Sequence, residues 1–146
     1  MRERIAIDRL APEGYRAVAA LERYVASAVD PAILHLVKLR ASVLNGCAFC
    51  VDLHSAEALA DGEDSRRLFA VAAWREGPFF DERERAALAL TDALTRLGGH
   101  GVPDEVWDEA MRHWSAEEVA NLVLAIGTIN VWNRIGVASR KQPPLR

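Results

Sequence analysis

One short segment constrains the fold of this chain more than any other. The turn-forming pair Asn45 and Gly46 separates two apolar helical patterns, and Cys47, Cys50 and His54 follow it with the spacing C-x-x-C-x-x-x-H. Because residues three and four apart lie on one face of a helix, these three side chains share one side of a helix that begins near Cys47. The segment therefore predicts a helical hairpin that carries two thiols and an imidazole on its second helix.

The start of that second helix is a favourable place for a thiolate. Unpaired backbone N–H groups and the positive end of the helix dipole stabilise negative charge there. Such settings lower the pKa of a cysteine thiol from about 8.5 to about 3.5–7.5. The segment is therefore typical of redox or metal chemistry, and a chance C-x-x-C is disfavoured because His54 lies in phase with Cys50.

Composition narrows the class of protein. The chain has 146 residues, 51% of them apolar and 27% charged, which suits one folded domain and not a disordered chain. A net charge of −3 gives no reason to propose nucleic acid or an anionic membrane as partner, and no apolar run approaches the length of a membrane span. The first residues, Met1 to Asp8, lack the apolar centre of a secretory signal. We therefore expect a cytoplasmic, reducing location, where a close cysteine pair is more often catalytic or metal-binding than a structural staple.

Helical periodicity extends over almost the whole chain, and no segment has a convincing strand pattern. Helix starts are marked by Pro12, by the pair Asp30-Pro31, and by the capping patterns Asp81-x-x-Glu84 and Ser115-x-x-Glu118. We predict an all-α, single-domain helical bundle built around the cysteine hairpin. The expected helices run from Pro12 through Val25, from Pro31 to about Leu44, from Cys47 to Ala60, after Asp64, from the Asp81 cap to Leu97, from Val102 through Met111, and from Ser115 to the prolines at 143 and 144.

The hairpin can bring a further histidine to the cysteine helix. If the two helices fold back about their turn, equal rise per residue places His35 level with His54 and Glu57. We therefore expect Cys47, Cys50, His54 and His35 around one pocket.

Two chemistries use this set of side chains. In thiol redox catalysis a thiolate attacks the O–O bond of a peroxide and becomes a sulfenic acid, and the second cysteine closes a disulfide. His54 would take the thiol proton and later give one to the leaving alkoxide. In a structural zinc site two thiolates and two imidazoles would bind the metal. Zinc is the weaker alternative, because three ligands would come from one and a half helical turns and no second C-x-x-C or H-x-x-x-H is present. A non-catalytic redox-sensing or disulfide-exchange subunit is a third alternative.

Several segments together resemble a known family. The stretch Leu36 to Ser42, followed by Asn45 to Cys50 and then His54-Ser55, is similar to the core of the alkyl hydroperoxidase D (AhpD-like) branch of the carboxymuconolactone decarboxylase superfamily. The segments 73–76, 79–89 and 129–134 agree with it as well. The resemblance implies one AhpD-like domain over residues 1–146, with its core at 31–140, and an all-helical fold that assembles through its helices into a homo-oligomer, a trimer or hexamer.

The same resemblance implies an activity. It points to a thiol-dependent peroxidase of peroxiredoxin type with an antioxidant role, or to a disulfide reductase, fed by a dithiol protein or small thiol and needing no cofactor or metal. In that family the second cysteine, here Cys50, attacks the peroxide, and Cys47 resolves the sulfenic acid and faces the partner. Chemistry alone leaves this order open, because Cys47 has the stronger claim on the helix end. True carboxymuconolactone decarboxylases lack the paired cysteines, so we do not expect lactone decarboxylation.

One position departs from the family pattern. The family has a glutamate twelve residues before the first cysteine, where this chain has His35. A histidine can bond to His54 or to a bridging water as a relay, but it supplies no fixed negative charge, so we expect weak activity and an altered pH optimum. Glu57 is a candidate replacement carboxylate, although a solvated charge on the helix face is the more common role for such a residue.

The remaining notable residues have structural interpretations first. His100 lies between glycines and is expected in a loop, and His113 is expected to interact with the last carbonyl groups of its helix. Trp132 and Asn133 are candidates to line the pocket. The last long helix is apolar on several sides, which indicates either cover by a neighbouring subunit or a central place in the monomer.

Overall fold

The computed structural model describes residues 1–145, and helices are the regular elements in it. The elements are α1 (Ile7–Leu10), α2 (Pro12–Ala28), α3 (Pro31–Asn45), α4 (Ala48–Ala60), α5 (Ser65–Ala70), the short 3₁₀ helix η1 (Val71–Ala73), α6 (Glu82–Thr95), α7 (Asp104–His113) and α8 (Ala116–Ser139). Within residues 1–145 strand-type pairing is limited to one isolated bridge between Gly98 and Gly101. The predicted all-α fold is confirmed.

Local capping explains where the long helices begin. The side chain of Asp30 accepts hydrogen bonds from the backbone N–H groups of the first turn of α3. Asp81 and Ser115 each form a complete capping box with the glutamate three residues later, Glu84 and Glu118. These starts are as predicted. The ends of α6 and α8 come earlier than expected, at Thr95 and Ser139, and the short helix α1 was not predicted.

The end of α8 has a clear cause. Arg140 adopts a left-handed backbone conformation with φ of 57°, and the backbone N–H of Lys141 then donates to the carbonyl of Gly136 at 3.0 Å. Helix α8 therefore ends before the prolines that were expected to end it.

His113 in α7 also differs from expectation, because its Nε2 bonds to Glu109 Oε1 at 2.8 Å and not to the last carbonyl groups of α7.

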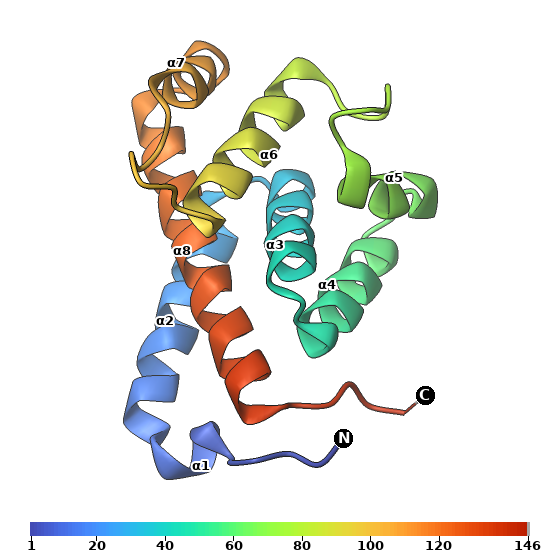
Figure 1. Cartoon of the computed structure of the whole chain (residues 1–146), viewed down its shortest axis with the longest axis vertical. Helices are drawn as coiled ribbons and strands as arrows, with labels where there is room; N and C mark the ends of the chain where they lie inside the picture. The colour runs from blue at the N-terminus through green and yellow to red at the C-terminus, as the bar shows by residue number, and fades with distance from the viewer. Residues whose placement is uncertain (146) are drawn as a thin grey trace.

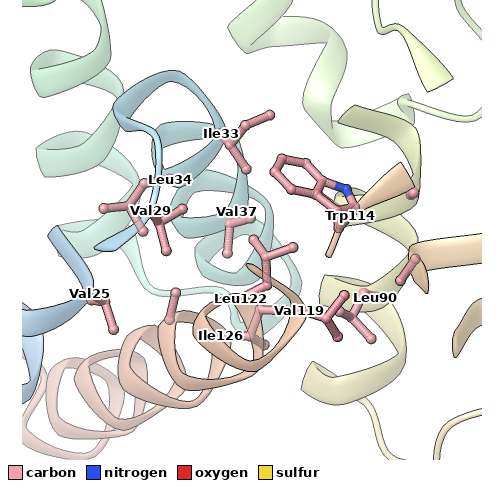
Figure 2. Packing of buried hydrophobic residues seen from close by; sticks show 14 residues of the cluster. Val25, Val29, Ile33, Leu34, Val37, Leu90, Trp114, Val119, Leu122 and Ile126 are labelled. Carbon is pink, nitrogen blue, oxygen red and sulfur yellow. The ribbon is translucent and has the colours of Figure 1, made fainter. Parts of the chain in front are cut away.

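Helix α3 lies at the centre of the bundle, with α4, α6 and α8 packed around it (Figure 1). One apolar core lies where α2, α3, α6, α7 and α8 meet (Figure 2). Its buried residues include Val25, Leu34, Val37, Leu90, Trp114, Val119, Leu122 and Ile126. A second core joins α3, α4, α5, η1 and α6 through Leu36, Leu39, Ala58, Leu68, Val71, Trp74, Phe80 and Leu88. Each large side chain buried in this way contributes about 1.5–3 kcal/mol.

Helix α8 crosses the bundle beside α2, α3 and α6. By length and composition it could span a membrane, and 44% of its apolar window is buried inside the bundle. Leu124 and Val131 on its outer side are partly exposed. Assembly through this side stays a prediction.

A buried ion pair links the central helix to α6. The Arg40 guanidinium donates to both carboxylate oxygens of Asp92, at 2.6 and 3.1 Å, and to the carbonyl groups of Val71 and Ala72. Trp74 Nε1 and Arg75 also donate to Asp92. Burial alone would raise the pKa of Asp92, but the bonds from the two arginines outweigh it, so that pKa is lowered.

Candidate active site

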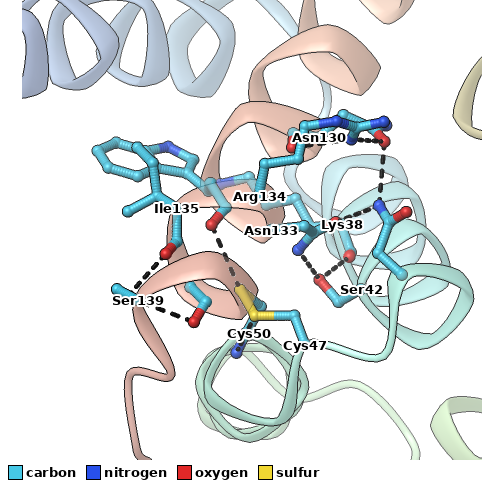
Figure 3. Close-up of a disulfide and its surroundings, with 12 residues drawn as sticks. Lys38, Ser42, Cys47, Cys50, Asn130, Asn133, Arg134, Ile135 and Ser139 are labelled. Atoms are coloured by element: carbon cyan, nitrogen blue, oxygen red, sulfur yellow. Dashed lines mark hydrogen bonds between the residues drawn. A yellow bond between two sulfur atoms is a disulfide. The ribbon is translucent and has the colours of Figure 1, made fainter. Parts of the chain in front are cut away.

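The two cysteines form a disulfide at the start of α4 (Figure 3). Gly46 ends α3 in a left-handed conformation with φ of 63°, and this turn places Cys47 as the N-cap of α4. The Cys47 sulfur accepts a hydrogen bond from the backbone N–H of Cys50 at 3.3 Å. Both cysteines are buried in the described structure. The predicted hairpin, its turn and the helix start at Cys47 are therefore confirmed.

Helix α8 packs directly against the disulfide. A Cβ atom added to Gly136 would lie 2.8 Å from Cys47 Sγ and 3.5 Å from Cys50 Sγ. The carbonyl oxygen of Trp132, one turn earlier, lies 4.0 Å from Cys50 Sγ (Figure 3). Gly136 was not among the residues predicted to lie at the site. A glycine inside a strongly apolar helix, one turn after Trp132, is the signal that could have found it.

Cys50 and His54 open onto one cavity of about 280 Å³. They lie one turn apart on α4 and share this cavity as the spacing predicted. Cys47 is not among the residues that line it. The apolar part of the lining consists of Tyr15, Phe49, Leu53, Trp132 and Ile135. Such walls suit an organic molecule with a compact apolar group.

His54 is set up as a neutral base. Its Nδ1 lies 3.1 Å from Glu57 Oε2, so with Nδ1 as donor its Nε2 keeps a lone pair. Burial lowers the pKa of His54 below its ordinary value, the bond to Glu57 opposes this, and the charge of Lys38 lowers the pKa further. The imidazole is therefore neutral at pH 7 and can accept a proton. Glu57, half exposed, bonds the catalytic candidate and is not only a solvated charge.

An ion pair in the cavity was not identified from the sequence. The Lys38 ammonium on α3 donates to Glu22 Oε1 on α2, and Trp132 Nε1 donates to Glu22 Oε2 at 3.2 Å. Both Glu22 and Lys38 line the cavity together with Cys50 and His54. A pattern signal existed for Glu22, because it falls four residues after Val18 and three before Val25, on the apolar side of its helix.

His35 does not join this group. Its Nε2 bonds to Asp61 Oδ2 at 2.6 Å, at the end of α4, and it is not part of the cavity lining. The prediction that the hairpin gathers His35 with Cys47, Cys50 and His54 around one pocket is wrong for His35, and also for Cys47, which is bonded to Cys50 but does not line the cavity. His35 meets the end of α4 one turn beyond Glu57, so its predicted level was also off, and the rotation of α3 presents Lys38 to the cavity instead.

The two candidates on α8 also separate. Trp132 lines the cavity, as proposed from the sequence. Asn133 is fully buried behind the disulfide, where it donates to Ser42 Oγ at 3.0 Å and accepts from Asn45 Nδ2 at 2.9 Å (Figure 3). This polar contact fixes the end of α3, and hence the turn before Cys47, to α8.

The arrangement gives little support to a zinc site. The two sulfurs are bonded to each other and His35 is turned to Asp61. Among residues 1–145, no group of three or more His, Cys, Asp and Glu side chains is arranged to hold a metal ion.

Comparison with known proteins gives consistent results. Residues 11–93 match the carboxymuconolactone decarboxylase family. The protein YdfG of Bacillus subtilis (strain 168) is 37% identical over 139 residues, which are 94% of this chain and 95% of that protein. YnjA of Escherichia coli (strain K12) is 32% identical over 117 residues, 77% of this chain and 61% of YnjA.

Solved structures share the fold. The Agrobacterium tumefaciens protein ATU0492, named as a candidate antioxidant defence protein AhpD, is 43% identical with a TM-score of 0.96, over 99% of this chain and 100% of that one. The debrominase Bmp8 is 23% identical with a TM-score of 0.81, over 91% of this chain and 72% of that one. A peroxidase-related protein from Silicibacter sp. TM1040 is 19% identical with a TM-score of 0.80, over 90% of this chain and 71% of that one. At such identities the last two likenesses concern the fold alone.

Proposed function

The chain belongs to the carboxymuconolactone decarboxylase family and fits its AhpD-like branch, and we propose that it is a thiol-dependent peroxidase that reduces organic hydroperoxides. The observation that carries the proposal is a C-x-x-C disulfide whose Cys50 shares one cavity with a buried, neutral His54. A redox-active pair beside a proton acceptor is what this reaction requires.

The reaction begins with the reduced pair. The Cys50 thiol gives its proton to His54, and the thiolate attacks one peroxide oxygen, so that an S–O bond forms while the O–O bond breaks. The sulfur is oxidised to sulfenic acid and the peroxide is reduced. The leaving alkoxide takes the proton from His54 and departs as an alcohol.

The second cysteine completes the cycle. Cys47 attacks the sulfenic sulfur, a disulfide forms, and the hydroxide that leaves combines with the Cys47 proton to give water. A dithiol protein or small thiol then returns two electrons and two protons to the disulfide. This role fits a reducing compartment such as the cytoplasm. Cys50 is assigned the attack because it lines the cavity and Cys47 does not.

Serine substitutions test the proposal. Purified wild-type protein, Cys47→Ser and Cys50→Ser are given cumene hydroperoxide with dithiothreitol, and peroxide loss is followed. We expect turnover by the wild type only. After one addition of peroxide and dimedone, intact mass should show a sulfenic acid adduct on Cys47→Ser and none on Cys50→Ser.

The peroxide assay, together with measurements of assembly and of metal content, separates the alternatives. Equal peroxide loss in all three proteins would rule out the catalysis. Oxidation that changes assembly or partner binding without turnover would favour a redox-sensing subunit. Stoichiometric zinc in protein purified without chelator, with thiols protected from alkylation, would favour the metal site.

A further inference from the structure

We propose that Lys38 supplies the fixed positive charge that keeps the Cys50 sulfur ionised, with Glu22 and Trp132 holding Lys38 in place. The inference rests on the proposed function in taking Cys50 as the attacking thiol. It assigns the central electrostatic role to a residue of α3 that lies outside the C-x-x-C-x-x-x-H segment.

A charge of this kind is needed in the cavity. Cys50 is 4% exposed, and an anionic sulfur removed from water needs a nearby cation or several donors to stay ionised. His54 is neutral at pH 7, so it offers no positive charge before it takes the thiol proton. Cys47, not Cys50, is the residue at the N-cap, where the helix dipole is strongest.

The cations available at the cavity are few. Its titratable side chains besides Cys50 are Tyr15, Glu22, Lys38, His54, Glu57 and Lys141. The two lysines are the only lysines of the chain. Lys141 Nζ lies over the Phe49 ring, 4.4 Å from its centre, just beyond the end of α8. The Lys38 side chain is only 9% exposed, so water screens its charge far less than the charge of a solvent-exposed lysine.

Glu22 does not cancel this charge at the site. At His54, one turn from Cys50, Lys38 lowers the pKa more strongly than Glu22 raises it. The carboxylate of Glu22 is bound on its other oxygen by the Trp132 indole N–H. Trp132 also contributes the carbonyl group beside Cys50 Sγ, so the same residue contacts the ion pair and the reacting sulfur. The ammonium is thereby held in place.

The positive charge of Lys38 stabilises an anion at two steps of the reaction. Before the attack it stabilises the Cys50 thiolate, and after the O–O bond breaks it stabilises the alkoxide until His54 returns the proton. Lys38 keeps its own protons throughout. The proton route from Cys50 to His54 to the alkoxide, and the electron balance, are unchanged.

The test reads the thiol directly and uses no peroxide. In a Cys47→Ser background Cys50 is the only thiol, and its rate of alkylation by iodoacetamide is measured against pH. We expect Lys38→Met to move the midpoint of the profile upward by about one pH unit, which lowers the rate about tenfold below the midpoint. Lys38→Arg should retain the parent profile within about threefold, because it keeps the charge.

Lys141→Met is the matched control, since it removes the same charge at the rim of the same cavity. We expect its profile to stay close to that of the parent. An unchanged profile in Lys38→Met, or an equal shift in Lys141→Met, would overturn the inference. Lys38→Met leaves Glu22 without its counter-charge, so the double variant Glu22→Gln with Lys38→Met removes both charges, and it should show the same upward shift.

This inference and the peroxidase proposal fail separately. A wild-type protein that does not consume peroxide while Lys38→Met shifts the alkylation profile refutes the proposed activity and leaves the role of Lys38 standing. Peroxide turnover by the wild type, together with an unshifted alkylation profile in Lys38→Met, refutes the role of Lys38 and leaves the proposed activity standing.

Discussion

Gly136 of α8 lies against the sulfur of Cys47, so closely that a Cβ atom at this position would come within 2.8 Å of it. The contact joins α8 to the N-cap residue of α4, and the two residues are far apart in the sequence. The disulfide can therefore pack against α8 only if position 136 has no side chain. Adding one methyl group at this position tests the contact.

Gly136→Ala is expected to destabilise the oxidised protein. The methyl group overlaps a sulfur that is fixed by its disulfide, and overpacking in a filled core costs about 1–3 kcal/mol. Alanine also favours the helix by roughly 0.5–1 kcal/mol, so the net loss is smaller than the overlap alone. Urea unfolding of the oxidised protein measures the change in the free energy of unfolding.

Gly127→Ala is the control on the same helix. Gly127 has nothing within 4 Å of its Cβ position and is exposed, so only the helix preference of alanine applies. We expect a gain of about 0.5–1 kcal/mol. Equal stability of the two variants would show that the contact at Cys47 is not tight.

The sequence predicted the hairpin well because its signals are local. The cap at Asp30, the left-handed Gly46 and the spacing from Cys47 to His54 each act within a few residues, so they could be recognised without knowing the fold. The bond between His54 and Glu57 is local as well, and it was considered, although a solvated Glu57 was thought more common.

The parts that sequence analysis missed depend on helix rotation and on distant pairing. Glu22 and Lys38 meet only because α2 and α3 both pack against α8, and each alone looks like an ordinary helix charge. His35 was misplaced for the same reason, since both its level and its direction depend on packing, and it meets Asp61, one turn beyond the predicted Glu57. Periodicity tells which residues share a face, and only packing tells which neighbour that face meets.

His35→Gln is expected to leave peroxide consumption within about twofold of the wild-type rate, because the residue lies outside the cavity and bonds the half-exposed end of α4. Loss of this pair should change the free energy of unfolding by about 0–1 kcal/mol, as for other exposed pairs. The comparison is made with the coupled dithiothreitol assay and urea unfolding. A rate that falls more than tenfold would restore His35 to the proton relay.

His54→Gln is expected to slow peroxide consumption about 100-fold or more, because a positioned acid or base contributes a factor of about 10²–10⁴. Cys50 should remain able to form its disulfide when oxidised slowly, so the variant can be compared in the same oxidation state. Glu105→Gln, on the exposed first turn of α7, is a matched surface control and should retain the wild-type rate.

The pH profile identifies the groups that tune His54. Its pKa lies below 6.5, chiefly through burial, so kcat/KM should fall on the acid side only below that pH. Glu57 raises this pKa, and Glu57→Gln should therefore lower it and move the acid limb to lower pH. Lys38 lowers the pKa, and Lys38→Met should move the acid limb to higher pH. Shifts in the same direction for both variants would contradict this account of the cavity.

Asp92→Asn is expected to be the most destabilising of these changes, although the residue is remote from the cysteines. The Asp92 side chain is 15% exposed and its partner Arg40 is 11% exposed, so the variant leaves a buried guanidinium without its counter-charge. Breaking a buried pair from one side costs about 3–5 kcal/mol. Arg75→Gln removes the exposed partner of the same carboxylate and should cost only about 0–1 kcal/mol.

Acid pH should reduce the difference between wild type and Asp92→Asn. The pKa of Asp92 is lowered in the folded protein, so its contribution is fully present above the ordinary value of about 3.9 and is lost as the pH falls through the lowered value. Urea unfolding at pH 7 and at pH 3 should therefore show a large gap between the two proteins that narrows at pH 3. A gap that is small at pH 7, or that widens on acidification, would mean that the ion pair between Arg40 and Asp92 does not hold α3 against α6.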